Sequence, residues 1–545
     1  MGHCRMNKSF RQSMAWLHTW AGLLLGWLLV AIFITGTSAY FREEITLWMQ
    51  PEVHDSTLQP GTVELAMAAL NAKAPDAKSW DINLPGPRQA AVELRWQPAK
   101  QPKNGGRQRG EQMLMDADSG EVVAPRATRG GNFLYRFHFE LYGIDRLWAR
   151  LLVCLATMFM LIAIISGVIT HKKIFKDFFT FRPGKGQRSW LDAHNATAVL
   201  ALPYHFMITY SGLLLFMTLI MPWGIDAAYE GDRRAFFSEV FSRGETPARP
   251  GAPEEMLAIG PLIEQTEARF GKPVERIQIT NPNRDNAQIT LQVDRDPAVT
   301  DRQRGGDPTQ VFQGNTGDLI DTRIPANDPV SPGWRIYNFF TSVHMARFAD
   351  PLTRWLFFLF GVAGSAMTVT GMLLWVSKRT QQLRRDQQPD RALKMVSGLN
   401  MTSITGLMLA IAAYFLANRL LPVTLTARED REIQIFFIVW LMSLVHGLLR
   451  PNRQGWIEQV AGASLLWLAI PVVNIFTTAS HLFTPLAWQH AAIASFDLVC
   501  LILAALGGYT LWRLQHKPLP AKARRTRTPR AANTASSKQP AGDTP

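Results

Sequence analysis

Eight apolar segments, each long enough to form a bilayer-spanning helix, are the feature that most constrains the fold of this 545-residue chain. A helix crosses the roughly 30 Å hydrocarbon layer in about 20 residues. The segments lie near residues 16–40, 148–170, 194–221, 353–376, 399–421, 433–449, 456–478 and 491–512. The hydrophobic content of 47% agrees with a chain that lies largely in lipid. We therefore expect a mainly α-helical membrane protein with eight transmembrane helices.

The first four segments carry a duplicated pattern, in which a histidine is followed by a Ser-Gly or Thr-Gly pair. The pattern occurs as His18 with Thr35-Gly36, His138 with Ser166-Gly167, His194 with Ser211-Gly212 and His344 with Thr370-Gly371. The interval from histidine to glycine is identical in the first and third occurrences and nearly identical in the second and fourth. The glycine pairs either let two helices pack closely, which we favour, or leave room for a flat cofactor. A pair of helices has therefore been duplicated.

Four histidines in register at a bilayer indicate ligands for a buried group, because an unpartnered charged imidazole is costly there. Zinc and copper ligands usually lie close in sequence, whereas these come from four helices. Two b-type hemes with two axial imidazoles each would suit the duplication, with His18 and His194 on one iron and His138 and His344 on the other. His205, about three helical turns after His194 and nearly on the same helix face, is an alternative ligand in the outer pair. A polar contact within the helices explains His205 equally well.

Basic residues assign the two sides of the membrane. They precede the first helix and follow the second and fourth, as Arg5, Lys8, Arg11, Lys172, Lys173, Lys176, Arg182, Lys185, Arg188, Lys378, Arg379, Arg384 and Arg385. The positive-inside rule makes these connections and both termini cytoplasmic, in a bacterial inner membrane. The net charge of +14 therefore indicates orientation and no nucleic-acid partner. His18 and His194 then lie near the inner face, and His138 and His344 lie near the outer face.

Two polar segments on the outside each have the pattern of a small α+β domain. Helical spacing at 63–74 precedes strands at 90–96 and 112–116 in one, and a helix at 253–270 precedes strands at 276–280, 288–293 and 310–312 in the other. Both end in matching turns, at 118–122 and 315–319. We expect a leader and first helix (1–40), a periplasmic domain (41–137), helices two and three (138–221), a second periplasmic domain (222–343), helix four (344–380), a linker (381–398), a four-helix bundle (399–513) and a disordered basic tail (514–545).

These features together resemble the PepSY-associated transmembrane family, which includes bacterial inner-membrane siderophore-iron reductases and iron-regulated membrane proteins. The resemblance covers about residues 10–380 and excludes the last four helices. It rests on the two turns and on the stretches Trp16-Leu17-His18 with Ile34-Thr35-Gly36, Phe137 to Leu141, Trp190 to His194, and Val343 to Phe348. It implies PepSY-like external domains and a heme-containing reductase that acts on ferric chelates from the periplasmic side.

The expected function is thus a di-heme oxidoreductase that passes electrons outward to a ferric siderophore and releases Fe(II). A membrane quinol is a candidate donor, since no nucleotide-binding motif is present in a suitable context. Residues just ahead of the outer histidines could contact an anionic siderophore, although an interfacial aromatic belt is our preferred interpretation: Tyr135, Arg136, Phe137, Trp334, Arg335 and Tyr337. Two alternatives stay open, a non-catalytic PepSY-type regulator of a periplasmic protease and an iron-chelate transporter.

Overall fold

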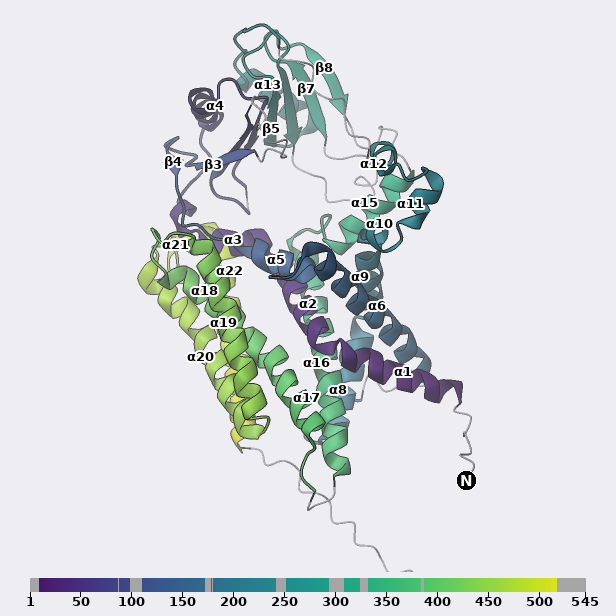
Figure 1. Cartoon of the computed structure of the whole chain (residues 1–545). Helices are drawn as coiled ribbons and strands as arrows, with labels where there is room; N and C mark the ends of the chain where they lie inside the picture. The colour runs from purple at the N-terminus through teal and green to yellow at the C-terminus, as the bar shows by residue number, and fades with distance from the viewer. Residues whose placement is uncertain are drawn as a thin grey trace, which may run out of the picture.

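The computed structural model describes residues 9–86, 88–98, 110–171, 178, 180–241, 251–293, 308–323, 332–383 and 387–516. The expected disordered tail lies outside the described residues from residue 517 onward. The chain forms a layer of long helices and, beyond one end of them, an antiparallel sheet (Figure 1).

Every apolar segment forms helix. In the described part of the chain, six helices are long and apolar enough to cross a membrane, and there are up to eight spans if each of two bent pairs counts as one. The six are α6 (Arg146–Thr170), α16 (Pro351–Gln382), a continuous helix of α17 (Arg391–Met401), a π-helical turn (Thr402–Gly406) and α18 (Leu407–Leu420), then α19 (Arg428–Leu449), α20 (Arg453–Thr477) and α22 (Ala491–His516). The bent pairs are α1 (Phe10–Leu24) with α2 (Gly26–Ala39), at 65°, and α8 (Gln187–Leu200) with α9 (Leu202–Leu215), at 69°.

The two bends are equivalent in the duplication and were not expected from the sequence. They lie at Leu25 and Ala201, and each follows the inner histidine of its own repeat by the same number of positions. Pro203 at the start of α9 explains one break, because its ring removes a helical hydrogen bond. The first bend has no proline nearby, so the break belongs to the repeat rather than to proline alone.

The outer histidines lie on two short helices of their own. His138 is on α5 (Gly131–Glu140) and His344 ends α15 (Pro332–His344), whereas the sequence placed them directly at the entries of the membrane helices. The next helix is then capped by an aspartate in each repeat: Asp145 accepts hydrogen bonds at the start of α6, and Asp350 does so at the start of α16.

The strands of both external segments form one eight-stranded sheet, in the order β4-β3-β2-β1-β5-β6-β7-β8. The strands are β1 (Ser79–Asn83), β2 (Val92–Gln97), β3 (Glu111–Met115), β4 (Val122–Val123), β5 (Val274–Thr280), β6 (Gln288–Val293), β7 (Thr309–Gln313) and β8 (Leu319–Arg323). The seam is the antiparallel pair β1–β5, where Trp80 lies opposite Ile279. Helices α4 (Thr62–Lys73) and α13 (Gly260–Phe270) pack on this apolar core through Leu70 and Leu262. The helix expected from residue 253 begins only at Gly260.

Short helices connect the two layers. They are α3 (Arg42–Met49), the 3-10 turn η1 (Pro51–Val53), α10 (Met217–Ile220), α11 (Trp223–Ala228) and α12 (Arg233–Phe241), whereas α21 (Pro485–Gln489) joins α20 to α22.

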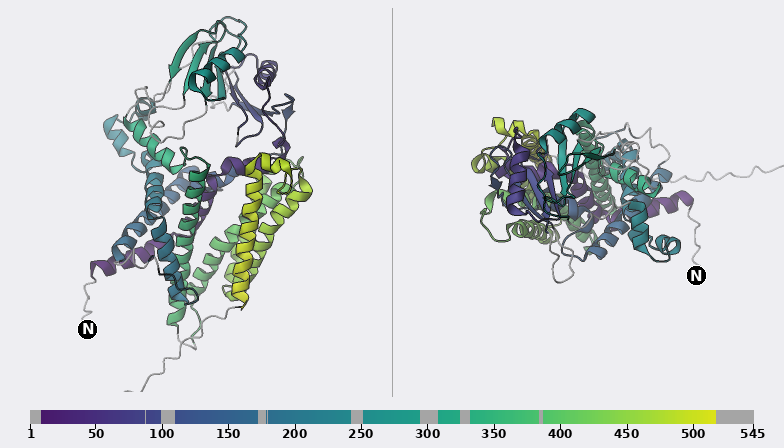
Figure 2. Two further views of the ribbon diagram at one scale, coloured as in Figure 1. Left: turned by 180° about the vertical axis from the view of Figure 1, so that it is seen from behind. Right: turned by 90° about the horizontal axis from the view of Figure 1, so that it is seen from above.

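The last membrane helices stand beside the duplicated part as a separate bundle (Figure 2). The bundle attaches through buried side chains: the Trp48 indole on α3 donates to Asp497 on α22 at 3.0 Å, and Phe137 on α5 packs against Phe436 and Trp440 on α19. Lower down, the Trp27 indole on α2 donates to Asn400 on α17 at 2.8 Å.

Candidate functional site

The inner histidines meet between the two repeats. His18 on α1 and His194 on α8 have ring centres 6.1 Å apart. Nδ1 of His18 donates to the Ala163 carbonyl of α6 at 2.8 Å, and Nδ1 of His194 donates to the Met367 carbonyl of α16 at 2.8 Å. Each ring is thus oriented by the second membrane helix of its own repeat.

The outer histidines meet in the same way. The ring centres of His138 and His344 are 6.3 Å apart. Nδ1 of His138 donates to the Ile32 carbonyl of α2 at 2.7 Å. Nδ1 of His344 lies 2.9 Å from the Ser211 hydroxyl on α9, and the Ile208 carbonyl is also a hydrogen-bond partner. The structure therefore brings together the two pairs that the sequence predicted.

Each glycine of the duplicated pattern faces one of these rings. A Cβ atom added to Gly36 would lie 2.5 Å from Cε1 of His138, and one added to Gly167 would lie 3.1 Å from Cε1 of His18. A Cβ atom added to Gly212 would lie 3.2 Å from Cε1 of His344, and one added to Gly371 would lie 3.2 Å from Cε1 of His194. The glycines therefore admit a histidine from the neighbouring helix, which is a form of the close helix approach that the sequence favoured.

Backbone carbonyls are the site groups that sequence reasoning missed. In every case the carbonyl that accepts from the histidine lies four residues before the glycine. In three of the four cases this carbonyl also accepts a hydrogen bond from the Ser or Thr hydroxyl of the motif. The Ser166 hydroxyl donates to the Ala163 carbonyl at 3.2 Å, and the Thr370 hydroxyl donates to the Met367 carbonyl at 3.0 Å. Thr35 instead donates to the Ala31 carbonyl at 2.6 Å. The motif itself was the signal, because helical Ser and Thr habitually bond carbonyls one turn back.

The spacing of each pair fits two trans ligands of one metal ion. A carbonyl only accepts, so Nδ1 carries the hydrogen and the neutral ring keeps its lone pair on Nε2. Bonds of about 2 Å from one metal ion to a nitrogen of each ring, together with the distance from each nitrogen to the centre of its ring, would place the ring centres roughly 6 Å apart. In the described parts of the chain, no group of three or more His, Cys, Asp or Glu side chains could hold a metal ion. Two imidazoles alone are the ligand set that a porphyrin iron requires, because the porphyrin supplies the other four nitrogens.

His205 joins neither pair. It is fully buried on α9, with its ring 6.4 Å from that of Phe33 on α2 and with Nε2 3.3 Å from where a Cβ of Gly364 would lie. The outer pair forms without it, so the alternative in which His205 replaces an outer ligand finds no support in this arrangement. Leu29 takes the equivalent position in the first repeat, since it follows His18 by the same interval as His205 follows His194.

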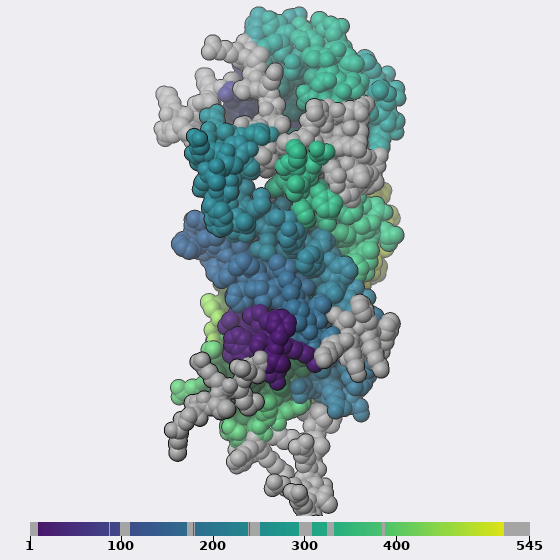
Figure 3. All heavy atoms as spheres, turned by 90° about the vertical axis from the view of Figure 1, so that its right-hand side faces the viewer, coloured from purple at the N-terminus to yellow at the C-terminus, as the bar shows by residue number. Residues whose placement is uncertain are grey.

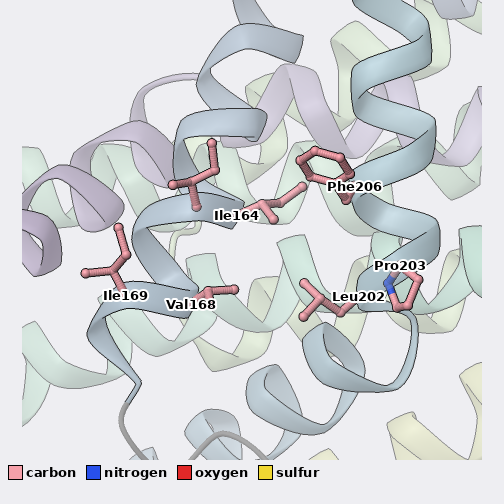
Figure 4. A pocket seen from close by; sticks show the side chains of 7 residues that line it. Ile164, Val168, Ile169, Leu202, Pro203 and Phe206 are labelled. Carbon is pink, nitrogen blue, oxygen red and sulfur yellow. The ribbon is translucent and has the colours of Figure 1, made fainter.

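An apolar pocket of about 470 Å³ lies between α6 and α9 (Figure 4). Ile164 and Val168 line it on α6, and Pro203 and Phe206 line it at the start of α9. Its lining offers only apolar side chains and suits hydrocarbon rather than a charged ligand.

Comparison with known proteins identifies the duplicated unit. Residues 15–378 match the model of the PepSY-associated TM region. The chain belongs to the PepSY-associated transmembrane family. The match begins just before His18 and ends just after Gly371, so the family unit contains both histidine pairs and both sheet segments but not the added bundle. A similar protein is Uncharacterized protein PA4219 of Pseudomonas aeruginosa, which is 22% identical over 344 residues covering 60% of this chain and 82% of that protein.

Proposed function

We propose that this PepSY-associated membrane protein is a di-heme oxidoreductase that passes electrons outward across a bacterial inner membrane to a ferric siderophore. One observation carries the proposal: two pairs of histidines, each with its Nδ1 hydrogen-bonded and its ring centre about 6 Å from its partner's, lie at two levels of one helical core. His18 and His194 would hold the inner heme, and His138 and His344 would hold the outer one. Bound heme would supply one-electron transfer, and the two histidines of each pair would hold its iron.

The direction of transfer is argued from charge. Basic residues lie in the connection after α6, including Arg182 and Lys185, and in the last turn of α16, where Arg379 lies, while the sheet lies at the opposite end of the helices. The positive-inside rule makes the basic end cytoplasmic and the sheet periplasmic, with both termini inside. Electrons would therefore enter near His18 and His194 and leave near His138 and His344.

The donor and the acceptor are inferred separately. The apolar pocket between α6 and α9 supports a lipid-soluble donor such as a membrane quinol. On the outer side, reduction would release iron from a ferric siderophore, because Fe(II) binds hard oxygen ligands less tightly than Fe(III) does. The family resemblance points to the same acceptor.

The test is the visible spectrum of the purified protein. We expect a reducible low-spin b-type spectrum and about two hemes per chain. His138→Ala should lose the outer heme alone, and His18→Ala should lose the inner heme alone. His205→Leu, which copies Leu29 of the first repeat, is the matched control and should retain both. A wild-type protein that is folded, supplied with heme and still colourless would refute the proposal.

A further inference from the structure

A second pocket, of about 390 Å³, opens at the outer end of α9. Its lining comes from α6, α9 and the short helices above them, and it includes Arg150, Leu215, Phe216, Arg233, Phe237 and Tyr337. Figure 3 shows this side of the molecule, where α11 and α12 in teal and α15 in green stand above α6 and α9 in blue. Unlike the pocket in Figure 4, this one combines aromatic rings with two guanidinium groups.

The pocket adjoins the outer histidine pair. Phe216 in its wall lies 6.3 Å, ring centre to ring centre, from Phe139, the neighbour of His138. Leu215 follows Gly212 by three residues on α9, and the Cβ position of Gly212 is 3.2 Å from Cε1 of His344. Three helical residues span about 4.5 Å, so the pocket lies about one helical turn from the outer pair.

The surroundings of the pocket carry an excess of positive charge. Three arginines share one carboxylate, Glu140, at 3.4 Å from Arg136, 3.3 Å from Arg146 and 2.5 Å from Arg150. One carboxylate neutralises one of three guanidinium groups, which leaves a net charge of about +2 beside the pocket. Arg233 is 57% exposed and forms an ion pair with Asp226 at 4.0 Å, so it contributes a donor group to the pocket but no further net charge.

Arg150 is held in place yet retains an unused donor. Its guanidinium lies 5.8 Å from the ring centre of Phe139 and 5.7 Å from that of Phe216. Its Nε atom is buried and has no hydrogen-bond partner among the described residues. The accessible remainder of the guanidinium lines the pocket, where an anionic oxygen would be favoured.

We propose that this pocket is the docking site for the acceptor, and that the acceptor is a negatively charged ferric chelate. The inference rests on the proposed function and adds the substrate class. Arg150 and Arg233 would bind the anionic oxygens of the chelate, and Phe216 and Tyr337 would contact its apolar parts. One electron supplied through the outer histidine pair would reduce the chelated Fe(III) to Fe(II) without uptake of a proton, and the bonds between iron and the chelate would break only afterwards, when Fe(II) is released.

The experiment measures binding of redox-inert gallium(III) chelates to the full-length protein by calorimetry. A gallium tris-catecholate is the anionic probe, and a gallium trihydroxamate without negative charge is the matched comparison. We expect Arg150→Gln and Arg233→Gln each to raise the Kd of the anionic chelate about tenfold, the effect of losing one charge-assisted contact. The Kd of the other chelate should change less than twofold. Arg323→Gln, an exposed arginine on β8, is the control and should change neither.

Three outcomes overturn the proposal. Equal effects on both chelates, or none, would show that the arginines do not select charge. Loss of the outer heme spectrum in Arg150→Gln would show that the arginines hold the porphyrin carboxylates instead. If adding phosphatidylglycerol to zwitterionic nanodiscs displaced the anionic chelate from the wild type, the pocket would be a lipid site. Because gallium is not reduced, charge-selective binding in a protein that lacks heme would refute the reductase and leave the pocket assignment standing.

Discussion

The four glycines that face the histidine rings make the site sensitive to a single methyl group. Gly36 has the closest contact, since its Cβ would lie 2.5 Å from both Cε1 and Nδ1 of His138. We expect Gly36→Ala to displace His138 from the Ile32 carbonyl and to reduce outer heme content more than tenfold. Alanine favours helix by about 1 kcal/mol over glycine, so a loss of heme could not be attributed to a weaker helix.

The comparison variant for this prediction is Gly22→Ala, because nothing lies within 4 Å of its Cβ position on α1. Heme per chain is measured by the pyridine hemochrome method, and the inner signal should persist in both variants. Full heme content in Gly36→Ala would contradict the role of the glycine.

His54, at the end of η1, is a buried neutral histidine outside the membrane-spanning helices. Its Nε2 donates to the Leu47 carbonyl at 2.6 Å, and its Nδ1 accepts from the Ser480 hydroxyl. Burial is the main cause that lowers the pKa of His54 from 6.5 to about 4; the Leu47 carbonyl and Glu52 oppose it, and Arg419 and His490 add to it.

The free energy of unfolding should therefore fall as the pH falls from 6.5 to about 4, because His54 takes up a proton in the unfolded chain and stays neutral in the folded chain. The loss is at most about 3 kcal/mol, and it disappears above pH 6.5, where both states are neutral. Thermal unfolding measured across this range checks the direction. His54→Gln can make both hydrogen bonds without titrating, and it should flatten the pH dependence; an unchanged slope would assign the effect to other groups.

The sequence predicted some of the contacts of single residues and not others. Register between the repeats was enough to pair His18 with His194 and His138 with His344, because duplication forces equivalent residues onto equivalent helices. The carbonyls of Ala163, Ile32 and Met367 lie four residues before the motif glycines, but the sequence does not show that they accept from histidines on neighbouring helices, because that contact depends on packing.

At the scale of elements, the added bundle is fixed to the duplicated core by buried polar contacts. Arg419 on α18 is 5% exposed, donates to Asn474 at 2.8 Å and to Asn418 at 2.7 Å, and lies 3.8 Å from the ring centre of Trp48 on α3. Arg419→Met should destabilise the protein by about 3 kcal/mol or more, because it removes one member of a buried network and leaves the others unpaired. Arg431→Met, at an exposed position of α19, should have almost no effect.

The measurement for these two variants is the temperature of half-unfolding in detergent, followed by tryptophan fluorescence. Equal values for Arg419→Met and the wild type would mean that apolar packing alone attaches the bundle.

Hydropathy located all eight apolar segments as helix but could not show where they bend or how the external strands pair. The breaks at Leu25 and Ala201 leave the hydropathy almost unchanged, so an average over the length of a whole span does not register them. The single sheet was missed for a different reason. Strands β1 and β5 are far apart in the chain, and alternation within each strand does not reveal its partner across a seam.

For the whole molecule, the two levels of histidines predict that electrons cross the bilayer only when both levels are intact. In vesicles that enclose dithionite, with the sheet facing outward, wild-type protein should reduce an external ferric chelate. His18→Ala should slow this reaction at least a hundredfold, although its outer heme should still respond to dithionite added outside. The rate of Fe(II) appearance, followed with an external ferrozine indicator, checks the prediction. Protein-free vesicles give the background rate caused by leakage of dithionite. Equal rates in both proteins would exclude a path through the inner pair.

The seam of the sheet has a consequence for how such a chain arose and is assembled. Strands β1 and β5 occupy equivalent places in the two repeats, and they pair with each other antiparallel. A protein with one repeat would present this strand as an open edge, and two copies would close it by pairing about a two-fold axis. The ancestor is therefore expected to have been a homodimer whose gene later fused. During synthesis, β1 is expected to remain unpaired until the segment that contains β5 has been made.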